Sequence, residues 1–194
     1  MSDLRKQLDP VFTECPSSTT ALPSVGSLYL YGLDLRICTL RILLQSFVDP
    51  LPTLLAVQYC QVSDWDRMLD DITELAPGLQ RLYLSTFPDE VRLPRRPDFL
   101  KNLQALVRLR VSGVCLDWDS LQYLGPEVNH LGLYGARISA AHLATNLAIR
   151  TAASGIKVDI RLETYSDRER SVLEVRNLLS THVRQLNACA RNSR

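Results

Sequence analysis

Short apolar sequence motifs recur along this 194-residue chain at a nearly constant spacing. Marked at the first of their alternating apolar residues, they fall at Leu28, Leu55, Leu82, Leu109, Leu131 and Val158. The marks are 27 residues apart for the first three steps, then 22, then 27 again. Self-similarity at a period of about 20–50 residues indicates a stack of structural units, in which each unit buries its apolar face against its neighbours. A repeated architecture is therefore the strongest constraint on the fold.

Each unit has the same internal pattern of apolar positions. Apolar residues are expected three positions before the mark and two, five and seven positions after it, as in Val25, Leu28, Leu30, Leu33 and Leu35. Of these 30 positions in six units, 26 are apolar, whereas a composition that is 46% hydrophobic would place about 14 there. Alternate residues of a strand point to opposite faces, so the mark and the residue two later should point inward.

The segments that return the chain from one strand to the next carry helical patterns. In the second unit, Ser63 with Asp66 three residues later predicts an N-terminal cap, and Ala76–Gly78 predicts the end of the helix. The short unit contains Gly125-Pro126, which cuts its return segment and accounts for the spacing of 22. The other return segments predicted as helical are 38–50, 97–106 and 138–155.

This pattern, L-x-x-L-x-L-x-x-N/C-x-L, resembles the leucine-rich repeat family. It is nearest to the intracellular subtypes of about 26–29 residues, the ribonuclease-inhibitor-like and cysteine-containing repeats. The resemblance covers about Leu22 to Tyr165, and the ninth position is Asn or Cys only at Cys60. It implies an α/β solenoid, a horseshoe of about six units with parallel strands on the concave face and helices on the convex face.

Three parts of the chain are predicted. Residues 1–24 form an N-terminal leader or cap with a linker, and residues 25–165 form the repeats. Residues 166–194 are expected to hold an amphipathic helix over 166–190, which starts at the capping-box pair Ser166 and Glu169, and a frayed tail. This helix either caps the open end of the stack or docks a partner.

Composition excludes several classes of protein. The net charge of +1 provides no global field for nucleic acid or membranes, and no apolar run is long enough to span a bilayer. The charged N-terminus does not resemble a secretory signal. Five scattered cysteines without a CxxC pair indicate reduced, packed thiols, including Cys60 and Cys115, and predict a cytoplasmic or nuclear location.

Catalysis finds no support in the sequence. The three histidines form no set with Ser, Cys and Asp that residue order could justify, and there is no Gly-rich phosphate loop or metal-ligand spacing. We therefore predict a protein that is not an enzyme and that needs no cofactor and no metal.

The outward strand positions should form three columns on the concave face. Tyrosine and arginine dominate these columns, and both are enriched at binding hot spots, although tyrosine also simply favours strands. The residues predicted to bind a partner are Tyr29, Tyr31, Arg81, Tyr83, Arg108, Arg110, His130, Tyr134, Lys157 and Arg161. Because the column before the marks becomes basic toward its C-terminal half, we expect a protein partner with an acidic or phosphorylated segment.

The leading hypothesis is a protein–protein interaction module, such as an adaptor or the substrate receptor of a ubiquitin ligase, a role that similar repeats often serve. One alternative is a structural subunit of a larger, ribonucleoprotein-type assembly. Another is a nucleic-acid binder that uses the basic column, which the near-neutral net charge disfavours.

Overall fold

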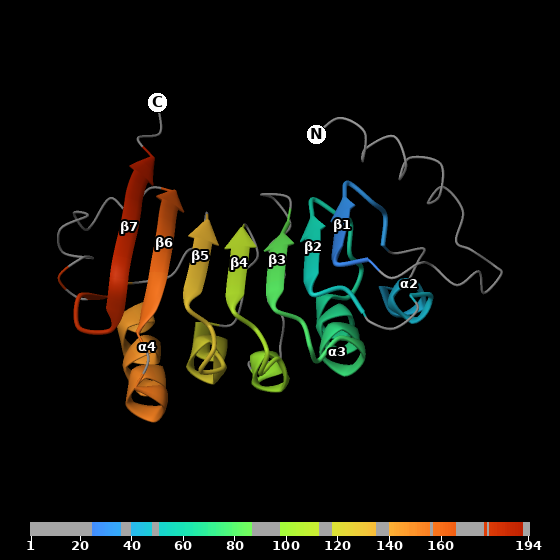
Figure 1. Cartoon of the computed structure of the whole chain (residues 1–194). Helices are drawn as coiled ribbons and strands as arrows, with labels where there is room; N and C mark the ends of the chain where they lie inside the picture. The colour runs from blue at the N-terminus through green and yellow to red at the C-terminus, as the bar shows by residue number, and fades with distance from the viewer. Residues whose placement is uncertain are drawn as a thin grey trace.

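Seven parallel β-strands form a single sheet in which spatial order equals sequence order (Figure 1). The computed structural model describes residues 25–35, 40–47, 51–86, 98–112, 118–134, 140–155, 157–165, 177 and 179–191. The strands are β1 (Ser27–Tyr31), β2 (Leu54–Gln58), β3 (Arg81–Ser85), β4 (Arg108–Ser112), β5 (His130–Tyr134), β6 (Val158–Tyr165) and β7 (Val183–Arg191). The predicted α/β class with a parallel sheet is confirmed, with seven strands where six were expected.

Helices occupy the return segments, because a parallel connection must carry the chain back to the start of the next strand. They lie in a row along one side of the sheet (Figure 1), and each contacts the next in chain order. They are α2 (Leu40–Gln45), α3 (Trp65–Leu75), the 3₁₀ helices η1 (Phe99–Asn102) and η2 (Trp118–Tyr123), and α4 (Ala140–Ser154). None of the helices in the described segments is long and apolar enough to cross a membrane.

The helix boundaries follow local chemistry. The Asp64 carboxylate, not the predicted Ser63, caps α3 by accepting a hydrogen bond of 3.0 Å from the backbone N–H of Arg67. Both residues suit an N-cap, and the helix begins one residue later than the capping-box spacing implied. Gly155 ends α4 at a φ of +70°, a left-handed conformation that glycine adopts without strain.

The strand register matches the repeat spacing along most of the sheet. Leu28, Leu55, Leu82, Leu109 and Leu131 are successive partners on neighbouring strands, as predicted. The sixth unit is different, since Ile160 and not Val158 lies opposite Leu131. A shift of two residues keeps the same side chains on the same face, and both Val158 and Ile160 are buried, so alternation alone could not distinguish these registers.

The core lies between the sheet and the helices. The inward residues of the strands, such as Leu82 and Leu109, form one buried cluster with helix residues that include Trp65, Leu69 and Ile72. Cys60 is also buried, as predicted, and its Sγ lies 3.5 Å from the backbone oxygens of Leu30 and Gln58. Burial raises the pKa of the Cys60 thiol, so the protein favours the neutral form. Cys115 lies outside the described residues.

The expected C-terminal helix over 166–190 is wrong from Val183 onward, because Val183–Arg191 form β7 and pair with β6. A bulge explains the misleading pattern. Val158 pairs with Val183 and Ile160 with Leu186, so a two-residue step in β6 faces a three-residue step in β7. That three-residue step imitated helical spacing. The leader over 1–24 and the proposed capping box at Ser166 and Glu169 lie outside the described residues.

Candidate binding surface

The outward positions of the strands form three rows that cross the outer face of the sheet, the face turned away from the helices. Register defines the first row as Ser27, Leu54, Arg81, Arg108, His130 and Asp159. The second row is Tyr29, Ala56, Tyr83, Arg110, Gly132 and Arg161, and the third is Tyr31, Gln58, Ser85, Ser112, Tyr134 and Glu163. Nine of the ten predicted binding residues therefore lie in these rows.

Lys157 is the exception, and its predicted place is wrong. It lies one residue before β6, and Asp159 takes its place beside His130 in the first row. The same two-residue shift moves Arg161 from the third row to the second, beside Gly132. The first row is thus basic only from Arg81 to Arg108 and then passes through His130 to a carboxylate.

Exposure divides the outer face into two parts. Tyr29 and Tyr31 of β1 are exposed, and Tyr31 makes an edge-to-face contact with Tyr59 at 5.5 Å between ring centroids. On β2, however, Leu54 is only 4% and Ala56 only 1% exposed, so two of the three outward positions of this strand do not contribute to an open surface. The rest of the predicted surface begins at β3.

The β3–β6 part of the outer face is rich in arginine. Arg81, Arg108, Arg110 and Arg161 are exposed, whereas Tyr83, His130 and Tyr134 are half-buried. The Arg110 guanidinium carbon lies 4.2 Å from the centroid of the Tyr134 ring, and that of Arg161 lies 5.7 Å from it. These distances are typical of cation–π contacts.

Gly132 makes room for this cluster. A Cβ atom added at Gly132 would lie 2.8 Å from Cε2 of Tyr134 and 3.4 Å from Cγ of Arg110. The Tyr134 ring therefore leans over the glycine, within reach of Arg110 on β4 and Arg161 on β6.

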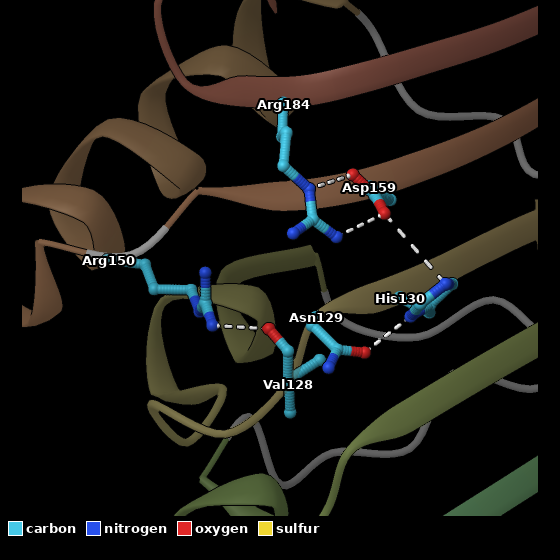
Figure 2. Close-up of polar contacts among 6 residues, drawn as sticks. All are labelled: Val128, Asn129, His130, Arg150, Asp159 and Arg184. Carbon is cyan, nitrogen blue, oxygen red and sulfur yellow. Dashed lines mark hydrogen bonds and ion pairs between the residues drawn. The ribbon is translucent and has the colours of Figure 1, made fainter.

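An ionic network of His130, Asp159 and Arg184 lies at the β5–β7 end of the first row (Figure 2). Arg184, at the bulge of β7, donates from Nε to the Asp159 carboxylate at 2.8 Å and also from its Nη2. His130 lies between Asn129, which it contacts through Nδ1, and Asp159, whose Oδ2 is 3.8 Å from Nε2. The hydrogen bond from Arg184 lowers the pKa of the Asp159 carboxyl below its ordinary value, against the opposing effect of burial.

Arg150 supports this network from the helix side (Figure 2). It belongs to α4, is only 1% exposed, and donates from Nη2 to the backbone oxygens of Val128 at 2.6 Å and Gly125 at 3.1 Å. Burial lowers the pKa of its guanidinium. Because Val128 directly precedes Asn129 and His130, these bonds fix the backbone from which both side chains extend.

Sequence reasoning missed Asp159 as a first-row residue and gave no role to Arg184 or Arg150. The carboxylate and Arg184 meet only through the register of β6 and the bulge of β7, neither of which has a local sequence signal. Arg150 lies within a helical pattern, and its acceptors are 22 to 25 residues away in the chain.

The described segments contain no group of three His, Cys, Asp or Glu side chains arranged to hold a metal ion. The chemistry of the outer face is instead that of cationic donors beside aromatic rings. A scan against models of known protein families found no match for this chain, and a search of curated proteins found no significantly similar sequence.

Proposed function

We propose that this chain is a leucine-rich-repeat protein that binds a protein partner on its outer face and catalyses no reaction. The repeat assignment is supported by the sequential parallel sheet, by the 27-residue register of β1–β4 and by the helices along one side. In this proposal the strands line the concave side of a solenoid and the helices its convex side.

The observation that carries the binding proposal is the exposed tyrosine and arginine of the outer face. Arg81 and Arg108 are neighbours in register, and neither forms an ion pair with any other residue that the structure describes. Exposed arginines beside aromatic rings are enriched at interface hot spots, because they bury area while they keep polar donors. We propose that the partner presents an acidic or phosphorylated segment to this surface.

Affinity purification with mass spectrometry tests the proposal. The double variant Tyr83→Ala/Arg108→Ala should lose the partners captured by the unchanged protein, since hot-spot truncations cost about 2 kcal/mol or more each. The matched control is Tyr123→Ala/Arg67→Ala, which removes an exposed tyrosine from η2 and an exposed arginine from α3 on the helix side. Equal loss of partners in both variants would contradict the proposal.

The same experiment separates the narrower versions of this function. Recovery of ubiquitin-ligase subunits would favour an adaptor or substrate receptor, a version that rests only on the resemblance of the repeats. If capture depends instead on the exposed helix-side residue Ile149 and on β7, the chain is a structural subunit of a larger assembly, and the binding role of the outer face is wrong.

A further inference from the structure

Three arginines of the outer face, which we call the arginine triad, are Arg81, Arg108 and Arg110. Arg81 and Arg108 are Cα partners on β3 and β4, and Arg110 follows Arg108 by two residues on the same face. Neighbouring strands are about 4.8 Å apart, and residues two apart in a strand are about 7 Å apart. Tyr83, the register partner of Arg110, completes the quadrilateral. Three long cationic side chains therefore extend from neighbouring positions of the same face.

The triad forms no ion pair with a described carboxylate. The one acidic residue in the described side chains of the same rows is Asp159, and Arg184 engages it through two nitrogens. His130 separates Asp159 from Arg108 in the first row. The acidic end of the row is thus compensated from β7, and the positive charge of the triad is left for a ligand.

Arg110 is held in place before any ligand binds. Its guanidinium stacks on Tyr134 at 4.2 Å, and Gly132 leaves the space that the ring needs. A stacked guanidinium keeps its N–H groups in the plane of the fork, free to donate to an anion. Such preorganisation lowers the entropic cost of binding.

We propose that the arginine triad is a recognition site for a single phosphoryl group carried by a side chain of the protein partner. A phosphate monoester carries a charge of about −1.5 to −2 and three acceptor oxygens, so it can use the bidentate donors of several arginines at once. A carboxylate has one charge and two oxygens, and would leave part of the triad unpaired. The Tyr83 hydroxyl adds a neutral donor at the fourth corner. This inference rests on the proposed function and specifies its ligand chemistry.

Titration of the full chain with small probes, followed by NMR of the arginine Nε–Hε groups at constant ionic strength, tests the site. Phenyl phosphate and N-acetylphosphoserine amide are the phosphoryl probes, and N-acetylaspartate amide is the carboxylate probe. The resonances of the triad should shift together on one saturable curve, with phosphoryl binding about tenfold or more tighter than carboxylate binding. Equal affinity for both chemistries would overturn the inference.

Arginine-to-lysine variants distinguish the contribution of the planar guanidinium group from that of its positive charge. Arg110→Lys should weaken phosphoryl binding about tenfold, because lysine keeps the charge but loses bidentate donation and stacking. Arg108→Lys tests the same point independently if the first variant does not fold. The matched control, Arg67→Lys on α3, should bind as the unchanged protein does. An equal loss in the control, or no loss in either triad variant, contradicts the site.

Oligouridylate is the competing probe. If it saturates the triad resonances at a lower concentration of phosphate groups than phenyl phosphate does, the surface reads a nucleic-acid backbone, and the inference is overturned. The outcome is also distinguishable from that of the proposed function. Loss of partner capture in Tyr83→Ala/Arg108→Ala without phosphoryl binding supports the proposed function and overturns the phosphoryl site. Phosphoryl binding together with equal partner capture in all variants supports the phosphoryl site and contradicts the proposed function.

Discussion

Gly132 shows how the absence of one side chain shapes the outer face. The Tyr134 ring leans over it and stacks with Arg110, so a position with no side chain of its own organises two residues of the surface. Glycine weakens a strand interior, where it has nothing to pack and loses more entropy than other residues. Its presence in β5 is explained by the close approach of the ring.

Gly132→Ala should therefore reduce binding more than stability. The new Cβ would meet the far end of the Tyr134 side chain, which can move, so unfolding free energy should change by less than about 1 kcal/mol. Displacing the ring removes the Arg110 stack, and phenyl phosphate affinity should fall about two- to fivefold, since an exposed cation–π contact is worth about 0.5–1 kcal/mol.

Urea denaturation and the NMR titration measure the two effects. Gly78→Ala is the control, because a Cβ there meets nothing within 4 Å and Gly78 lies outside the strands. Unchanged phosphate affinity in Gly132→Ala would show that the stack does not organise Arg110.

At the scale of elements, β7 decides the charge of the outer face. Arg184 reaches Asp159 because the bulge between Val158 and Asp159 places an extra residue in β7 at this point. The bulge thus both produces the helix-like spacing of the sequence and places Arg184, the counter-charge, beside Asp159. A strand here also means that the last return segment ends before Val183.

The Arg184–Asp159 pair predicts a specific pH dependence. Because Arg184 lowers the folded-state pKa of Asp159, the pair stabilises the protein fully above the ordinary aspartate pKa of about 4, and the contribution is lost as pH falls below it. Arg184→Gln should lower the unfolding free energy at pH 7, and should lower it less at pH 2–3. The difference in unfolding free energy between pH 7 and pH 2–3 should therefore be smaller in Arg184→Gln than in the unchanged protein.

Urea denaturation at both pH values measures this difference. Arg67→Gln removes a charge from the exposed side of α3 and should leave the difference as it is in the unchanged protein. A full-sized difference in Arg184→Gln would mean that the pair contributes nothing to acid sensitivity.

At the scale of the whole molecule, β3 and β4 separate stability from binding. Their inward residues join a single core that runs along the sheet, whereas their outward arginines, Arg81, Arg108 and Arg110, are exposed. In a stack of units, each interface supports its neighbours, so the loss of one inward residue weakens more than one unit. The exposed arginines of β3 and β4 do not belong to this core, so their loss should not weaken the interfaces between units.

Two adjacent substitutions in β3 test this division. Leu82→Ala removes a side chain that is fully buried and should cost about 2–5 kcal/mol of unfolding free energy. Arg81→Ala, one residue earlier and exposed, should change stability by no more than about 0.5 kcal/mol while it weakens phosphoryl binding. Similar losses of stability in urea denaturation would contradict the separation of the two faces.

The periodic pattern predicted which residues face inward, because strand alternation is a local rule of backbone geometry. It also predicted the register of Leu28, Leu55, Leu82 and Leu109, since equal repeats place equivalent residues side by side. The Arg81–Arg108 pair of the binding surface follows directly from that constant spacing.

Three features were decided only by the tertiary structure: the two-residue shift of β6, the strand in place of the helix at Val183–Arg191, and the burial of Leu54 and Ala56 on the outer face. A shift of two leaves every side chain on its face, and a bulge imitates a helical step, so neither changes the local pattern. Burial depends on what lies across from a residue in space. The counter-charge at Arg184 and the support from Arg150 arise in the same way, from contacts between segments more than 20 residues apart.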